Sequence, residues 1–185
     1  MRQVELPIRE NRIVLIGGGV RSGKSSFALE TALRLGNRRA FIATATALDD
    51  EMKTRIDRHR REREGEFTTV EEPVDLAAAL DSLSDCDVAV VDCLTLWLSN
   101  LLLHQESTDA ILARADDVVR VLEKRRFHVV LVTNEVGMSV HPPTPLGRMF
   151  VEVTGWTHQR IAKVADEIYL AALGTTLRMK PPPGA

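Results

Sequence analysis

Residues 13–25 read IVLIGGGVRSGKS, an apolar run that passes directly into a glycine-rich loop. Gly18, Gly23, Lys24 and Ser25 occupy the defined positions of the P-loop pattern G-x-x-x-x-G-K-[ST]. The apolar run predicts a strand before the loop, and the following residues predict a helix, which is the context this pattern requires. Backbone N–H groups would converge on phosphate oxygens at the start of that helix, where its dipole favours negative charge. The stretch therefore predicts nucleotide binding.

The residues of this loop have distinct expected roles. Lys24 would bridge the β- and γ-phosphates of the nucleotide, and Ser25 would ligate Mg²⁺. The full set of expected nucleotide contacts in the loop is Gly18, Gly19, Val20, Arg21, Ser22, Gly23, Lys24 and Ser25.

The metal also needs a carboxylate from another buried strand. Asp92 directly follows the apolar run 88–91, as a Walker-B residue does, and the carboxyl ends of parallel strands face the ligand crevice. The alternative is that Asp92 only caps a helix beginning near Leu94. A second polar group, TNEVG at 133–137, follows another expected strand and would face the same crevice, unless it forms a plain turn.

The rest of the chain alternates short apolar runs with helical patterns, which predicts an α/β fold. Strands are expected at residues 12–16, 39–44, 88–91, 127–133 and 167–172. Helices are expected at 24–35, 49–64, 74–82, 94–104, 108–125 and 146–165, the first stopped by Asn37 and the fifth capped by Thr108 and Asp109. Because the apolar runs lack strict alternation, we expect a mostly parallel sheet with helices on both faces. With the P-loop, this indicates a P-loop NTPase fold of the RecA-like class.

Composition limits the other possibilities. The 185 residues, 44% of them hydrophobic, suit a single domain, expected over residues 1–180 with a frayed proline-rich tail at 181–185. The 24 basic and 26 acidic residues give a net charge of −2, so no positive excess favours nucleic acid. No apolar stretch approaches the ~20 residues of a membrane span. Cys86 and Cys93 suit small core positions, and the first residues lack a signal-peptide pattern, so a cytoplasmic location is expected.

Residues 49–63 form a highly charged segment with one histidine, His59, among five arginines. Its acidic residues come first and its basic residues last, which suits the dipole of a solvated surface helix. The alternative is that His59 attacks the α-phosphate of a nucleotide held by the neighbouring guanidinium groups. On the residues alone, the chain is a P-loop kinase-like transferase of unknown acceptor.

Several blocks in one order resemble the bifunctional adenosylcobinamide kinase / adenosylcobinamide-phosphate guanylyltransferase family of cobalamin biosynthesis. The resemblance spans roughly residues 12 to 180. Its blocks are GGVRSGKS at 18–25, FIATA at 41–45, DDEM at 49–52, RI at 55–56, HR at 59–60, VTNEVGM at 132–138, HQR at 158–160 and ADEI at 165–168. Three departures are the charged run RRER at 60–63, in place of a glycine-containing turn, Asp92, where some relatives carry glutamate, and HPPTP at 141–145, an unusual loop after the asparagine–glutamate block.

The resemblance implies two reactions. ATP or GTP phosphorylates adenosylcobinamide, and GTP then donates GMP to adenosylcobinamide phosphate, giving adenosylcobinamide-GDP and pyrophosphate through a histidine–GMP intermediate. It implies that His59 carries the GMP, with Lys24 the second catalytic residue, and it implies a homotrimer. The further nucleotide contacts it implies are Ala43, Thr44, Ala45, Arg60, Arg61, Glu62, Arg63, Glu71 and Asp92.

Two other functions are compatible with the P-loop. A simple P-loop kinase for another small alcohol would leave His59 as surface charge, and a non-catalytic nucleotide-binding regulator would lack turnover. The remaining histidines show no zinc-ligand spacing, so His104, His128, His141 and His158 are predicted to be loop or helix-surface residues. Trp97 is predicted to be a core or subunit contact rather than a platform for the corrin ring.

Overall fold

The computed structural model describes residues 11–46 and 65–182. Within these residues, seven strands form one sheet in the order β3-β2-β4-β5-β1-β6-β7. Neighbouring strands are parallel except for β6 and β7, which pair antiparallel, and this confirms the mostly parallel sheet. The strands are β1 (Ile13–Gly18), β2 (Arg39–Ala43), β3 (Thr68–Glu71), β4 (Val88–Asp92), β5 (His128–Asn134), β6 (Glu167–Ala172) and β7 (Thr175–Lys180).

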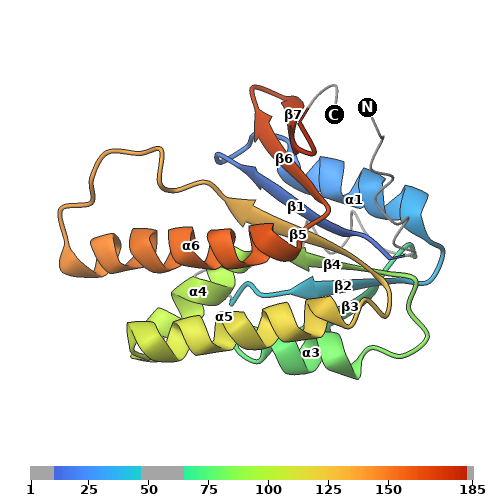
Figure 1. Cartoon of the computed structure of the whole chain (residues 1–185), viewed down its shortest axis with the longest axis horizontal. Coiled ribbons are helices and arrows are strands. Elements are labelled where there is room, and N and C mark those ends of the chain that lie inside the picture. Colours follow the sequence, from blue (N-terminus) through green and yellow to red (C-terminus); the bar gives the residue numbers. More distant parts are fainter. Residues whose placement is uncertain (1–10, 47–64, 183–185) are drawn as a thin grey trace, which may run out of the picture.

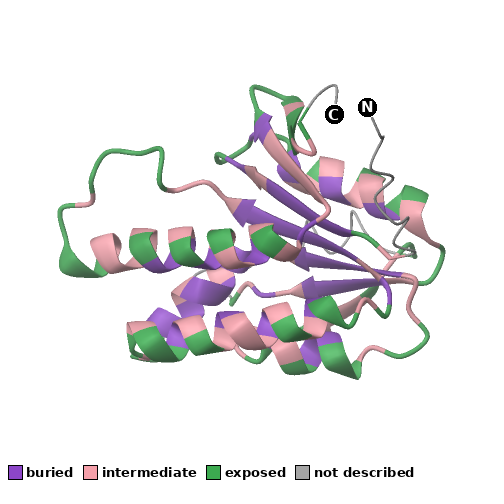
Figure 2. Cartoon of the chain, in the orientation of Figure 1, coloured by how far each residue is buried: buried purple, intermediate pink, exposed green. Residues whose placement is uncertain are grey.

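Helices cover both faces of the sheet (Figure 1). The described helices are α1 (Lys24–Leu35), α3 (Leu76–Ser82), α4 (Leu94–Leu103), α5 (Thr108–Glu123) and α6 (Pro145–Val164). In β1, Val14 and Ile16 pack in the core cluster that includes α1, whereas Ile13 and Leu15 pack in the cluster that includes α3 to α6. Figure 2 shows the central strands as the most buried part of the chain. A strand buried on both faces reads as a continuous apolar run, as predicted.

The predicted elements differ from the structure mainly at the sheet edges. All five predicted strands are present, but β3 and β7 were not predicted. Both are edge strands with few buried residues, so neither carries the continuous apolar run that marks the central strands. The predicted helix 49–64 lies outside the described residues.

The bounds predicted for α1 are confirmed, but two predicted helix-terminal residues need correction. Ser107, rather than Thr108, caps α5, because its side chain accepts a hydrogen bond from the backbone N–H of Ala110. Helix α1 ends at Leu35 with Gly36 as its C-cap, one residue before the predicted stop at Asn37. No helix within residues 11–46 and 65–182 combines the length and the apolar character needed to cross a bilayer.

Candidate nucleotide site

The P-loop ends on an open helix N-terminus. Gly23, the N-cap of α1, adopts a left-handed conformation with φ of 95°, which favours glycine. In the described part of the chain, no side chain caps this helix end and its first turn contains no acidic residue. The first N–H groups of α1 are therefore available to an anion, as the sequence predicts.

The second glycine of the loop is required by packing. A Cβ added at Gly18 would lie 2.4 Å from the carbonyl oxygen of Ala171 in β6. A Cβ added at Gly19 would meet no atom within 4 Å. The carbonyl oxygen of Gly18 also accepts a hydrogen bond from the N–H of Glu135, at 3.1 Å. The loop is thus fitted between the ends of β5 and β6.

Lys24 and two serines line the loop from inside. The Lys24 side chain is buried and its Nζ donates to the carbonyl oxygen of Gly19 at 2.9 Å, so the ammonium is folded back across the loop. Ser22 is buried, and its Oγ has no hydrogen-bond partner among the described residues. Ser25 is half-buried in the first turn of α1. In contrast, Val20 and Arg21 are exposed at the crest of the loop.

Three of the predicted nucleotide contacts share one row at the carboxyl edge of the sheet. Asp92, the last residue of β4, lies opposite Ala43 in β2, and Ala43 lies opposite Glu71 in β3. The N-cap position of α4 is occupied by Cys93, one residue after Asp92. This position disfavours helix capping as the role of Asp92. Burial raises the pKa of the Cys93 thiol, Asp92 raises it further and Lys24 lowers it. Both charges therefore act on one buried sulfur.

Thr44 is built into the scaffold under this row. It is fully buried, and its hydroxyl both donates to the carbonyl oxygen of Cys93, at 2.7 Å, and accepts from the N–H of Cys93, at 2.8 Å. Its own carbonyl oxygen accepts from Asn100 Nδ2 at 2.8 Å. Because these bonds occupy the hydroxyl, Thr44 ties β2 to the start of α4, and the half-buried Ala43 and Ala45 are the more accessible residues of this stretch.

The polar group at 133–137 lies beside the P-loop. Thr133 and Asn134 in β5 lie opposite Gly17 and Gly18 in β1. Asn134 Nδ2 donates to Thr95 Oγ1 at 2.8 Å, and Glu135 Oε1 accepts from the N–H of Gly137 at 2.7 Å. This segment therefore lies at the same edge of the sheet as the P-loop, and part of it forms a turn.

His158 is not the surface residue that the sequence predicts. Its Nε2 lies 2.7 Å from Thr133 Oγ1, and burial lowers its pKa, an effect that the Glu135 carboxylate partly offsets. His158 is four residues after Thr154 and three before Ile161, which are both fully buried. This helical spacing is the signal that could have identified it.

The other histidines and Trp97, which the sequence does not assign to the nucleotide site, have surface or structural positions. His104 and His141 are exposed as predicted, whereas His128 begins β5 and its Nδ1 accepts from the N–H of Arg12. Trp97 is a core residue, 1% exposed, whose Nε1 donates to the carbonyl oxygen of Val74. Within residues 11–46 and 65–182, no cluster of three or more histidine, cysteine, aspartate or glutamate side chains could hold a metal ion.

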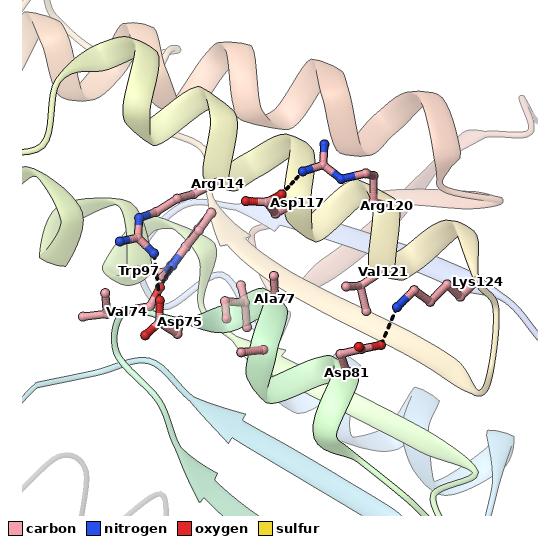
Figure 3. A pocket seen from close by; sticks show the side chains of 12 residues that line it. Val74, Asp75, Ala77, Asp81, Trp97, Arg114, Asp117, Arg120, Val121 and Lys124 are labelled. Carbon is pink, nitrogen blue, oxygen red and sulfur yellow. Dashed lines mark hydrogen bonds and ion pairs between the residues drawn. The ribbon is translucent and has the colours of Figure 1, made fainter.

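A groove of about 450 Å³ lies between α3 and α5 (Figure 3), and no residue of the P-loop lines it. Its basic side chains have acidic partners: Lys124 pairs with Asp81 at 2.7 Å and Arg114 with Asp75 at 2.8 Å. Arg120 pairs with a neighbouring aspartate on its own helix. Since these charges are compensated, the groove does not compete with the P-loop as a phosphate site.

The remaining predicted site residues, His59, Arg60, Arg61, Glu62 and Arg63, lie outside the described residues.

Comparison with known proteins identifies relatives over nearly the whole chain. Residues 14–179 match the family described as cobinamide kinase / cobinamide phosphate guanyltransferase. The bifunctional adenosylcobalamin biosynthesis protein CobP of Pseudomonas aeruginosa is 39% identical over 170 residues, covering 91% of this chain and 98% of that protein. The proteins named CobU from Escherichia coli and Salmonella typhimurium are 33% and 36% identical, each covering 91% of this chain and 99% of theirs.

Solved structures resemble the chain in fold. The RadB recombinase superposes with a TM-score of 0.51 at 17% identity, covering 86% of this chain and 73% of that one. The flagellar accessory protein FlaH of Methanocaldococcus jannaschii superposes with a TM-score of 0.53 at 12% identity, covering 94% and 81%. These likenesses confirm the predicted P-loop NTPase, RecA-like fold.

Proposed function

This chain belongs to the cobinamide kinase / cobinamide phosphate guanyltransferase family, and from that premise we propose that it catalyses both reactions in cobalamin biosynthesis. It first transfers the γ-phosphate of ATP or GTP to adenosylcobinamide. It then transfers GMP from GTP to adenosylcobinamide phosphate, giving adenosylcobinamide-GDP. The observation that carries the proposal is the complete P-loop on the open N-terminus of α1, in a chain 33–39% identical to bifunctional relatives.

In the kinase step, the hydroxyl oxygen of the acceptor attacks the γ-phosphorus. The bond from that phosphorus to the β–γ bridging oxygen breaks, and the hydroxyl proton is released. We expect the uncapped N–H groups at the start of α1 and the Lys24 ammonium to offset the charge on the transferred group. Charge stabilisation and positioning are the main contributions a protein makes to phosphoryl transfer.

Mg²⁺ would be held by Ser25 and Asp92. A hydroxyl and a carboxylate are oxygen donors, which Mg²⁺ prefers, and the two residues lie at the start of α1 and the end of β4 on the same edge of the sheet. When bound with the nucleotide, the ion neutralises charge on the phosphate oxygens. Lys24 would supply a second positive charge there.

In the guanylyl-transfer step, His59 is the nucleophile. A neutral imidazole nitrogen attacks the α-phosphorus of GTP, and the bond to the α–β bridging oxygen breaks with loss of pyrophosphate. A phosphate oxygen of adenosylcobinamide phosphate then attacks the same phosphorus and releases His59. The nucleotide contacts that follow His59 are Arg60, Arg61, Glu62 and Arg63. The further contacts are Ala43, Ala45 and Glu71. Thr44 positions its two neighbours in the chain.

Labelling distinguishes this enzyme from a simple kinase. The protein is incubated with Mg²⁺ and either α-³²P-GTP or γ-³²P-GTP, then denatured, separated on a gel and treated with mild acid. We expect an acid-labile protein label from the α-labelled nucleotide only, lost in His59→Ala and kept in His104→Ala, which changes an exposed histidine. Phosphorylation of adenosylcobinamide that survives in His59→Ala, with no α-label in the wild type, would favour the simple kinase.

The oligomeric state and the cellular location are inferred from the family resemblance. We propose a homotrimer that works in the cytoplasm, and its mass in solution, measured by light scattering, tests the trimer.

A further inference from the structure

The turn between β6 and β7 is unusual for a two-residue hairpin. Leu173 and Gly174 both adopt left-handed conformations, with φ of 54° and 77°. Such turns favour asparagine, aspartate or glycine at the first position, because a larger side chain is strained there. Leu173 is nevertheless leucine, and its side chain is 100% exposed. The turn thus holds an apolar side chain fully in solvent at a conformational cost.

This turn stands beside the P-loop. A Cβ added at Gly23 would lie 3.9 Å from the Cα of Gly174, and one at Gly18 would collide with the carbonyl oxygen of Ala171. The hairpin, at the red end of the colour scale, rises next to the loop that joins β1 to α1 (Figure 1). Val20, on the crest of that loop, is a second exposed apolar side chain, 76% exposed. An apolar rim therefore adjoins the open end of α1.

The two sides of the P-loop differ in chemistry. On the β5 side, Asn134 and Glu135 present hydrogen-bonding groups. On the β6 side, Leu173 presents only methyl and methylene groups. Phosphates need the charged and N–H-rich loop itself, whereas the flat faces of a purine gain from contact with an apolar surface. Within the described residues, the exposed apolar side chains after β5, Met138 and Val140, lie beyond the turn at Gly137, whereas Leu173 lies in the turn directly beside the loop. A nucleoside seated on the loop therefore meets an apolar surface on the β6 side.

We propose that Leu173 forms the apolar wall against which the purine base of the P-loop nucleotide packs during the kinase step. The proposal rests on the proposed kinase function and identifies a binding residue for it. Because a leucine side chain makes no hydrogen bond, this wall holds adenine and guanine alike. The wall is separate from the row of Ala43, Glu71 and Asp92, which lies at the β2, β3 and β4 ends of the sheet.

Calorimetric titration with Mg²⁺–ATP and with Mg²⁺ and inorganic tripolyphosphate tests this assignment, because tripolyphosphate keeps the chain of three phosphates but lacks the nucleoside. Leu173→Asn removes the wall while placing a residue that the turn favours. We expect it to weaken ATP and GTP binding about fivefold, a rough value for losing part of a leucine contact, and to leave tripolyphosphate binding unchanged. Leu173→Met should bind as the wild type does, as should Leu103→Ser, which changes a half-exposed leucine at the end of α4.

The outcomes separate the two proposals. Equal weakening of ATP and tripolyphosphate in Leu173→Asn would mean that the turn shapes the loop, and would overturn the wall. Unchanged ATP binding in Leu173→Asn, with both ligands lost in Lys24→Ala, would overturn the wall and leave the P-loop function intact. A change in molecular mass without a change in ATP affinity would make Leu173 a subunit contact instead. ATP binding that survives in Lys24→Ala would count against the P-loop function itself.

Discussion

The two edges of the sheet use polar groups in opposite ways. At the amino edge, charges are paired within the chain: Arg125 bonds both oxygens of Asp166, and Asp166 also accepts from the N–H of Ile13. At the carboxyl edge, α1 begins without a side-chain cap, and Ser22 Oγ has no partner within the described residues. Polar groups at the amino edge thus stabilise the fold, while the carboxyl edge keeps an uncapped helix end and the Ser22 hydroxyl for a ligand.

The largest effect should come from Lys24→Ala at the carboxyl edge. Loss of its ammonium should lower kcat/KM of the kinase step by on the order of 10²–10³-fold, because that charge acts on the transferred phosphoryl group. Steady-state kinetics with adenosylcobinamide measure this. Lys124→Ala is the matched control, since Lys124 pairs with Asp81 far from the loop. Similar kinetics in the two variants would remove the functional distinction between the edges.

Gly18→Ala should be the most destabilising change within the P-loop. Its Cβ would collide with backbone of β6, so we expect a loss of about 1–3 kcal/mol in the free energy of unfolding. Gly19→Ala, one residue later, meets nothing and should stay within about 0.5 kcal/mol. Urea denaturation of the pair measures the difference. Equal stabilities would contradict the close packing of the loop on β6.

Arg125→Met tests the amino edge. The Arg125 side chain is 17% exposed and also donates to the carbonyl oxygens of Asn11 and Val164. Its loss should cost about 1–2 kcal/mol of stability and leave tripolyphosphate binding unchanged. Arg12→Met, which breaks a more exposed pair with Glu167, should cost less. Weakened ligand binding in Arg125→Met would show that the two edges are not independent.

The smallest effect should be a change in pH dependence at His158. Burial lowers its pKa in the folded state, so below about pH 6.5 the unfolded chain binds protons that the folded chain does not. His158 therefore has no effect well above that pH, and its stability cost grows as pH falls toward the folded-state pKa. His158→Gln removes this titration and keeps a group that can bond Thr133.

Urea denaturation at about pH 7 and about pH 5.5 measures this effect. The glutamine variant should lose less stability between the two than the wild type, by under about 1 kcal/mol. His128, whose pKa is also lowered by burial, contributes equally to both proteins and cancels. Gln159→Ala, an exposed neighbour, should keep the wild-type pH dependence, and an identical dependence in His158→Gln would contradict the assignment.

Local pattern was sufficient for the bounds of α1, which follows the P-loop, and of β6. The bounds predicted for α1 and β6 match the structure, since a buried run or a helical period is written in consecutive residues. Edge strands β3 and β7 were missed because pairing with one neighbour, rather than burial, holds them in the sheet. His158 was misassigned because its partner Thr133 is 25 residues away in sequence.

The sequence by itself determined the P-loop, the α/β class and the family, because each depends on residue types at defined spacings. Only the tertiary structure decided which groups meet. Strand order and register placed Ala43 between Asp92 and Glu71, and they set Gly174 beside Gly23. The tertiary structure also took up the Thr44 hydroxyl in hydrogen bonds to Cys93. Contacts between residues distant in sequence depend on how strands pair and helices pack, and no local pattern records that pairing.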